Sequence, residues 1–110
     1  MIAMAIASAI YLVAVQAAVN VPRAAFSACL DQAVIKARAE KIEVAAFSQY
    51  ARAACSAESS KFKNALISFD VKNKVSRKTA TSDADLQIDD YIDGSTRQYR
   101  RQMPLSAKPG

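Results

Sequence analysis

The stretch FSACLDQAVIKA, residues 26–37, decides the fold prediction. Its apolar residues recur at intervals of three and four, so a helix over 23–41 gathers them on one face. Pro22 suits the first turn of this helix, and Ile35 points away from the apolar face. The inward-facing residues are Phe26, Cys29, Leu30, Ala33, Val34 and Ala37. An amphipathic helix of this kind needs other elements to cover its apolar face.

A second helix is predicted over 45–71, from an apolar stripe about 120° wide. The serine-rich stretch 56–60 is a place where this helix could bend, and Asn73 is the expected left-handed residue at its end. The residues on the stripe are Phe47, Ala51, Ala54, Cys55, Phe62, Ala65, Leu66 and Phe69.

A third helix is predicted over 76–101, with Ser76 as its N-cap. The Gly94-Ser95 pair is expected to kink this helix or to end it early. Its inner face is expected to carry Ala80, Ala84, Ile88, Tyr91, Ile92, Ser95 and Tyr99. Residues 104–110 are expected to form a disordered tail. The sequence therefore predicts an all-α, antiparallel three-helix bundle, as one helical domain over 18–103.

The N-terminal segment differs in composition from the rest of the chain. Of the first 21 residues 18 are apolar, and every charged side chain follows this segment. Residues 2–15 have the length of a signal-peptide core, although no basic residue precedes it, and small residues favour cleavage between Ala17 and Ala18. We therefore expect residues 1–17 to be a signal peptide, and the mature protein to be periplasmic or secreted. The alternative is a single-pass inner-membrane anchor, in which residues 1–21 stay uncleaved.

The two cysteines are placed symmetrically about the first predicted turn. With that turn centred on residue 42, Cys29 precedes it and Cys55 follows it by the same number of residues. Because both helices rise about 1.5 Å per residue, the two cysteines stand at equal height in an antiparallel hairpin. A short exported chain with two cysteines also favours a disulfide over free thiols. The sequence therefore predicts a Cys29–Cys55 disulfide between the first two helices.

The residue types that are missing exclude most catalytic chemistry. The chain has no histidine and only two glycines, Gly94 and Gly110, so it cannot build histidine-based catalysis, a Cys/His zinc site or a glycine-rich phosphate loop. No base lies beside a serine to make it a nucleophile. Residues 89–93, DDYID, match the D-D-x-x-D pattern of terpene synthases, but so short a chain lacks the large cavity and second metal motif of those enzymes. We expect a protein that is not an enzyme and that holds no cofactor and no metal.

Aspartates form a stripe along the third predicted helix. Asp85, Asp89 and Asp93 follow one another at intervals of four and border its apolar face. If that helix folds back from a turn near residue 74, Lys61 and Lys63 come level with Asp85 and Asp89. We expect interhelix ion pairs there, and weak binding of Ca²⁺ or Mg²⁺ is the alternative.

The basic residues gather in two stretches. Residues 61–78 contain six basic residues and one acidic residue, and no acidic residue follows Asp93. An exported protein rarely meets nucleic acid, so we expect an anionic envelope component or a protein as the partner, and no nucleic acid. The membrane is a partner only if residues 1–21 stay uncleaved, and a solvated surface that maintains solubility is the alternative. The predicted surface comprises Lys61, Lys63, Lys72, Lys74, Arg77, Lys78, Arg97, Arg100 and Arg101.

Glu58 is a charged residue within the apolar stripe predicted for 45–71. A carboxylate buried there without a partner would be unfavourable. Arg23 or the Tyr91 hydroxyl could pair with it, or the helix could bend at this point. A functional carboxylate is the alternative interpretation.

Four short stretches resemble a known group of proteins: AFSACL at 25–30, YARAAC at 50–55, FDVKN at 69–73 and QIDDY at 87–91. They span most of the mature chain and are similar to small exported helical proteins of alphaproteobacteria. The resemblance implies export and an all-helical form, and no reaction. We therefore expect a non-enzymatic binding or structural module of the cell envelope. The alternatives are a membrane-anchored accessory subunit that retains residues 1–21, and an enzyme that uses Glu58 with the aspartate stripe.

Overall fold

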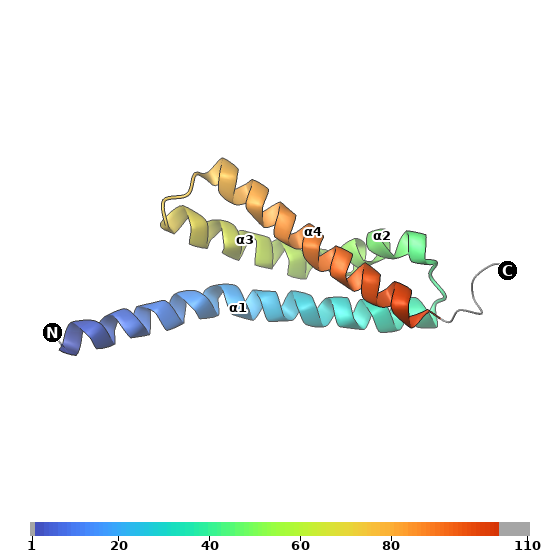
Figure 1. Cartoon of the computed structure of the whole chain (residues 1–110), viewed down its shortest axis with the longest axis horizontal. Coiled ribbons are helices and arrows are strands. Elements are labelled where there is room, and N and C mark those ends of the chain that lie inside the picture. Colours follow the sequence, from blue (N-terminus) through green and yellow to red (C-terminus); the bar gives the residue numbers. More distant parts are fainter. Residues whose placement is uncertain (1, 104–110) are drawn as a thin grey trace.

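The computed structural model describes the backbone of residues 2–103 and the side chains of residues 17–103. Within this part of the chain all regular structure is helical: α1 (Ile2–Ala39), α2 (Val44–Ala54), α3 (Ser56–Lys72) and α4 (Arg77–Gln102). α1 runs along the length of the molecule, α2 and α3 return in the opposite direction, and α4 crosses over them (Figure 1). The predicted all-α fold is confirmed, but the described residues form four helices and not three.

α1 begins much earlier than predicted. It starts at Ile2 and continues through Pro22, which lies inside it, so the prediction of a helix start near residue 23 is wrong. The alanine-rich sequence before the proline has a high helix propensity, and the missing N–H removes one backbone hydrogen bond, to the carbonyl of Ala18. Figure 1 shows α1 gently bent along its length, as a proline inside a helix allows.

The helix predicted over 45–71 is broken into α2 and α3 at Cys55. This residue leaves the helical region, with φ −112° and ψ 23°, yet its N–H still donates to the Ala51 carbonyl at 3.0 Å. Its own carbonyl accepts from the N–H of Ser59 at 2.9 Å, so the bend keeps hydrogen bonds on both sides. The break rotates the buried face of α3 relative to that of α2, so that Ile67 is buried and Phe69, predicted on the inner stripe, is exposed. Ala54, also predicted on that stripe, is exposed at the end of α2.

The inner faces predicted for the first and third helices are confirmed. On α1 Cys29 is half-buried and the other predicted inner residues are buried; on α4 the half-buried residue is Tyr91. Ile35 points outward, as predicted, and is 59% exposed. The buried residues of the four helices form one core, which among the described side chains begins at Val19 and ends at Tyr99.

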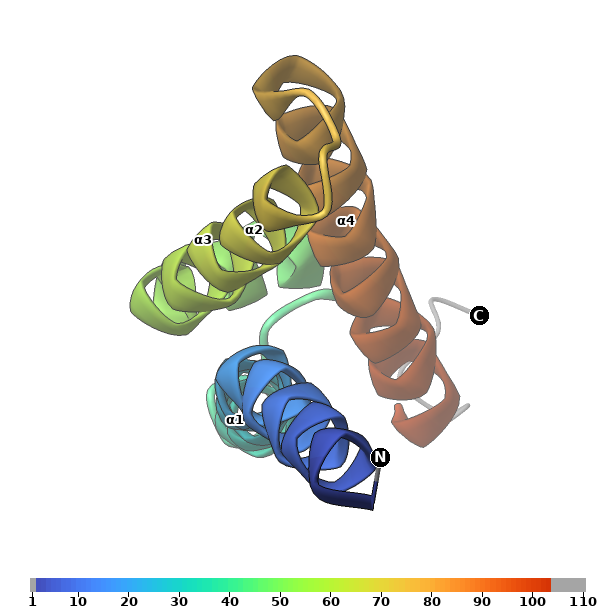
Figure 2. The ribbon, with the colours of Figure 1, turned by 90° about the vertical axis from the view of Figure 1, so that its left-hand side faces the viewer.

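Three aromatic rings from three helices meet in the middle of the core. The Phe26 ring of α1 lies 6.0 Å from that of Phe62 and 5.7 Å from that of Tyr91, measured between ring centroids. Phe62 of α3 and Tyr91 of α4 meet edge to face at 5.5 Å. Figure 2 shows α1, α3 and α4 at three corners around this interior. Aromatic pairs in such tilted arrangements each add about 0.5–1.5 kcal/mol beyond their buried area.

A second aromatic group packs the last turns of α4 against α2 and against the loop that precedes α2. The Tyr99 ring stacks on the Phe47 ring with centroids 4.5 Å apart, and its hydroxyl donates to the carbonyl of Ile42 at 2.5 Å. Tyr50 lies beside Phe47, with centroids 6.5 Å apart. We call the group Ile42, Phe47, Tyr50 and Tyr99 the closed end of the molecule.

The two turns that follow α1 and α3 have the same construction. Lys41 and Lys74 have positive φ, 58° and 68°, and the next residue's N–H bonds back to the helix, from Ile42 to Ala37 and from Val75 to Asp70. This is the Schellman pattern, in which glycine usually takes the left-handed position. Asn73 was predicted to be left-handed but has φ −94°, so that prediction was wrong by one residue.

α4 begins as predicted and ends later. The Ser76 hydroxyl accepts a hydrogen bond from the N–H of Thr79 at 3.2 Å, which confirms the predicted N-cap. The helix continues through Gly94-Ser95 to Gln102, so the prediction that this pair ends it early is wrong. Helical hydrogen bonds and the buried Tyr99 outweigh the low helix propensity of one glycine. The tail predicted at 104–110 lies outside the described residues.

Candidate functional site

The predicted cysteine pair is at disulfide distance. The sulfur atoms of Cys29 and Cys55 lie 2.16 Å apart and their Cα atoms 5.9 Å apart. Cys29 lies on α1, and Cys55 is the fully buried residue at which α2 meets α3. The pair therefore joins α1 to the bend between the other two helices. Neither cysteine is left as a free thiol for redox or nucleophilic chemistry.

The predicted cleavage point lies inside α1. Ala17 and Ala18 are exposed on the helix, and the neighbouring Val19 is part of the core at 8% exposure. Among the residues whose side chains the structure describes, no helix combines the length and apolarity needed to cross a membrane.

The nine basic residues predicted as one surface lie in separate places. Six lie on α3, on the following turn and at the start of α4, whereas three lie in the last turns of α4. Arg77 and Arg97 are about 30 Å apart along the helix axis, at about 1.5 Å per residue. Figure 1 shows the two ends of α4 at opposite ends of the bundle. The sequence grouping therefore corresponds to two basic regions and not to one.

The first basic region is concentrated at the turn between α3 and α4. We call residues 72–78 the tip. Its four cations are all exposed, and the ion pairs found among residues 17–103 include none of them. They are Lys72, Lys74, Arg77 and Lys78. Phe69, one turn before Lys72 on α3, is 36% exposed beside them. The tip thus presents positive charge next to an aromatic ring.

The remaining lysines of the first region differ in their surroundings. Lys61 is exposed in the middle of α3. The ammonium of Lys63 lies 2.6 Å from the Asp85 carboxylate on α4, so its charge is balanced within the bundle. Lys63 therefore has a structural contact and is not a free contributor to a basic surface.

The second basic region surrounds the end of α4. Arg97, Arg100 and Arg101 are exposed, and the last two lie in the final turn, where cations interact favourably with the helix dipole. Burial raises the pKa of the nearby Tyr99 above its ordinary value, and the charge of Arg38 at the end of α1 offsets part of this rise. Arg100 and Arg101 therefore have a local interaction with the end of their own helix.

One ion pair predicted for the aspartate stripe forms, between Lys63 and Asp85, whereas Lys61 takes part in no ion pair among the described residues. Besides the Lys63–Asp85 pair, Arg52 of α2 lies 2.9 Å from Asp89. Both pairs are exposed, and such pairs stabilise by about 0–1 kcal/mol. Among the described residues no cluster of three or more metal-ligating side chains occurs, including at the D-D-x-x-D match.

Glu58 is accommodated by the bend and not by either predicted partner. It is half-buried in the first turn of α3, where a carboxylate interacts favourably with the helix dipole. Arg23 instead places its guanidinium over the Phe62 ring, 5.3 Å from the centroid, and donates to the Asn20 side chain at 2.7 Å. Among residues 17–103 no ion pair or side-chain hydrogen bond of Glu58 occurs.

Tyr50 is the other tyrosine with a perturbed hydroxyl. Its O–H donates to the Glu40 carboxylate at 2.5 Å, and this bond, followed by burial, raises the pKa of Tyr50. Both perturbed tyrosines thus lie at the closed end, and their contacts are structural.

Comparison with known proteins gives no further guide to the site. No family model, no curated protein and no solved structure matches this chain.

Proposed function

We propose that this chain is a non-enzymatic exported module of the cell envelope that docks on an anionic membrane surface through its tip, which extends the membrane contact expected for the uncleaved chain to the cleaved protein. The charge of the tip carries this proposal. Four cations stand within seven residues, exposed and outside the ion pairs of the bundle. Each Lys or Arg near an anionic lipid surface contributes about 1 kcal/mol, so four form an effective electrostatic contact.

The shape and composition of the tip also favour a lipid surface. The turn lies at one extremity of the α3–α4 hairpin (Figure 1), and its four cations are exposed there. The partly exposed Phe69 ring adds an apolar side chain to the cations, a combination found in proteins that bind at the interface of lipid bilayers. These features support membrane docking over docking on another protein.

Export is supported by the cysteine pair, whose sulfur atoms lie at disulfide distance. A disulfide is stable in the periplasm and outside the cell, and is rare in the cytosol. The proposed mature protein starts at Ala18 and acts in the periplasm or outside the cell.

Vesicle sedimentation tests the proposed docking. The purified protein should bind vesicles of phosphatidylglycerol at low salt, lose binding steeply as salt rises, and ignore vesicles of phosphatidylcholine. Changing the four tip cations, Lys72, Lys74, Arg77 and Lys78, to Gln should abolish binding. The matched control changes Lys61, Arg97, Arg100 and Arg101 to Gln, which removes the same charge and should leave most binding intact. Equal losses in both variants, or no binding of the unchanged protein at low salt, would refute docking by the tip.

A membrane-anchored accessory subunit is the second candidate. The arrangement that favours it is that the N-terminal end of α1 and the tip lie toward the same end of the molecule in Figure 1. An anchor formed by residues 1–21 would thus hold the tip near the lipid. Mass spectrometry of the protein from its native host decides between the candidates, because a mature N-terminus at Ala18 excludes the anchor.

A further inference from the structure

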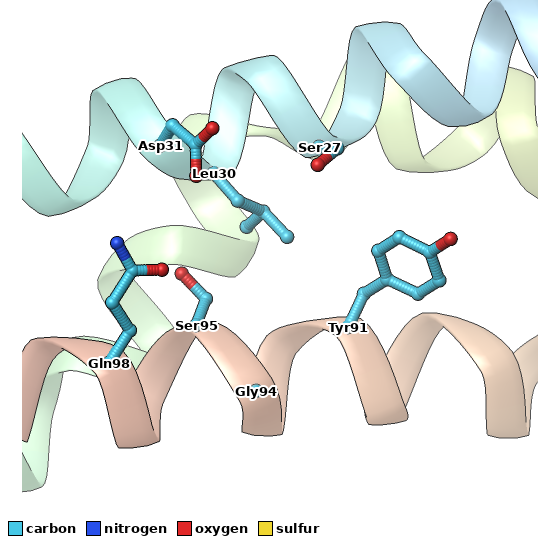
Figure 3. Close-up of a pocket in the computed structure, with 7 residues that line it drawn as sticks. All are labelled: Ser27, Leu30, Asp31, Tyr91, Gly94, Ser95 and Gln98. Atoms are coloured by element: carbon cyan, nitrogen blue, oxygen red, sulfur yellow. The ribbon is translucent and has the colours of Figure 1, made fainter.

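A cavity of about 210 Å³ lies between α1 and α4, away from the tip. Three residues of α1 and four of α4 line it, and Figure 3 shows the two helices facing each other across it. The lining residues are Ser27, Leu30, Asp31, Tyr91, Gly94, Ser95 and Gln98. Its volume is below the ~300 Å³ at which sites for drug-sized molecules begin, so its occupant is small.

Ser95 is the unusual member of this lining. Its side chain is 7% exposed, and its hydroxyl oxygen makes no hydrogen bond within the protein. The adjacent Thr96 shows how a helical hydroxyl is normally satisfied, since it donates to the Ile92 carbonyl one turn earlier at 2.8 Å. Ser95 instead points away from its own helix into the cavity (Figure 3). A buried polar group without a partner is unfavourable by about 1–3 kcal/mol, and a ligand that bonds to it removes this penalty.

Two further polar groups lie at the same side of the cavity as Ser95, whereas the Ser27 and Tyr91 hydroxyls lie beyond Leu30. Figure 3 shows the Asp31 carboxylate on α1 facing the Ser95 hydroxyl and the Gln98 amide on α4. Asp31 is the only charged residue among the seven that line the cavity. A carboxylate, a hydroxyl and an amide carbonyl together offer three acceptors, which matches the three N–H donors of a primary ammonium group.

The other side of the cavity carries its larger apolar groups. Leu30 extends from α1 toward α4, and the Tyr91 ring stands to one side of it, with the Ser27 hydroxyl on α1 between them (Figure 3). The Tyr91 ring is fixed by its contacts with Phe26 and Phe62, so this wall is preformed. Such a wall suits a short hydrocarbon chain.

We propose that the α1–α4 cavity is a binding site for a small primary alkylammonium ion. The ammonium group donates to the Asp31 carboxylate, the Ser95 hydroxyl and the Gln98 side-chain carbonyl, and the carbon chain packs on Leu30 and Tyr91. No covalent step is involved. This site is independent of the tip and of the docking proposed above.

Nuclear magnetic resonance titration of the ¹⁵N-labelled full chain tests the site with three probes of one carbon skeleton. Propylammonium chloride should shift the amide signals of residues 27–31 and 94–98 saturably, with a dissociation constant in the millimolar range that so small a ligand can reach. The neutral 1-propanol and the anionic propionate should bind at least about tenfold more weakly, because they lack the charge-assisted bonds to Asp31. Saturable shifts of equal strength with 1-propanol or propionate, or none with propylammonium, would overturn the proposal.

Two substitutions and one control identify the contacts. Asp31→Asn and Ser95→Ala should each weaken propylammonium binding by about tenfold. Asp90→Asn, at an exposed aspartate outside the cavity, removes the same charge and should leave binding unchanged. Ser95→Ala should keep or raise the melting temperature of the ligand-free protein, since the hydroxyl has no partner to lose. A lower melting temperature, or unchanged binding in Ser95→Ala, would contradict the assignment. Propylammonium binding should persist in the variant whose four tip cations are changed to Gln. The outcome of this titration therefore does not depend on vesicle docking.

Discussion

The closed end and the tip are built from the same kind of turn but differ in what surrounds it. Both turns have a left-handed lysine where glycine is usual. At the closed end, the loop that contains Lys41 receives the Tyr99 hydroxyl bond and lies beside the Phe47–Tyr99 stack. At the tip, Lys74 is flanked by exposed cations, and the nearby Phe69 remains partly in solvent. The turn at the closed end is held by buried aromatic rings and a hydroxyl bond from another helix, whereas the turn at the tip is held by the half-buried Val71 and Val75 and by local hydrogen bonds.

This difference indicates a division of roles between the two ends. Buried aromatic area and a side-chain bond across the loop stabilise the closed end. Unbalanced positive charge at the tip adds nothing to stability and raises the attraction for anions. The tip is therefore the end available for a partner, and substitutions at the two ends should separate stability from binding.

Truncating a phenylalanine at each end should give the largest contrast. Phe47→Ala should lower the free energy of unfolding by about 3–5 kcal/mol, because Phe47 is fully buried and stacks on Tyr99. Phe69→Ala should lower it by no more than about 1.5 kcal/mol, because the ring is partly exposed already. Urea unfolding followed by circular dichroism measures both. Similar losses in the two variants would remove the distinction between the ends.

Removing the cysteine pair should have the next largest effect. The Cys29→Ala/Cys55→Ala variant frees a loop with a sequence separation of 26 residues, and the chain-entropy relation gives a loss of about 3–4 kcal/mol. Reduction of the unchanged protein should give a similar loss, measured by urea unfolding with and without a reductant. A reductant that lowers the stability of the double variant by the same amount would show that the loss does not come from the disulfide.

Alkaline pH should weaken the closed end specifically. The pKa values of Tyr50 and Tyr99 are raised in the folded protein above their ordinary value of 10.0, so the native state holds these protons more tightly than the unfolded chain. The contribution of the two protonated tyrosines to the free energy of unfolding is complete below about pH 10. It is lost as pH rises through their raised pKa values in the folded protein. Tyr99→Phe should cost about 1 kcal/mol at neutral pH, through loss of the bond to Ile42, and should make the decline above pH 10 shallower.

The measurement is the urea midpoint between pH 8 and pH 11.5, with Tyr91→Phe as the control. Tyr91 has no side-chain hydrogen bond to another described residue, so this control should keep the full alkaline decline. An identical decline in Tyr99→Phe would show that Tyr99 does not contribute to it.

Glycine substitutions at the tip should give the smallest effects, with opposite signs. Lys74→Gly should raise the free energy of unfolding by about 0.5–1 kcal/mol, because Lys74 has φ 68° and glycine adopts that region without a steric penalty. Lys72→Gly, in the last turn of α3, should lower it by a similar amount. Both changes remove one cation, so both should weaken vesicle binding equally. Stability changes of the same sign would contradict the assigned backbone conformations.

The apolar spacing of the sequence was enough to predict the inner faces of α1 and α4 and the pairing of Cys29 with Cys55. Each of these depends on helical geometry within one element or across one short loop. A bend was expected at the serine-rich stretch 56–60, and the break at Cys55 lies one residue before it. Its effect on the buried face was not predictable in the same way, because the apolar stripe continues through it. The exposure of Phe69 and the burial of Ile67 were therefore missed.

The candidate sites were less accessible from sequence than the helices. The basic residues near 61–78 and 97–101 are similar in composition, and only the path of α4 shows that they lie at opposite ends. The Arg52–Asp89 pair depends on where α2 lies against α4, which local patterns do not specify. Ser95 was predicted on the inner face, but its lack of a partner depends on the space left between two helices.

The cysteine bridge divides the chain into segments that respond differently to a protease. Residues 29–55 form a covalent ring that contains the exposed Lys41. Trypsin cleavage after Lys41 therefore leaves two fragments that stay joined until the sulfur bond is reduced. The tip lies outside the ring, so cleavage after Lys72 or Lys74 leaves α4 without a covalent bond to the other helices. A single trypsin cleavage therefore leaves the two products covalently joined or divides them, depending on which lysine is cut.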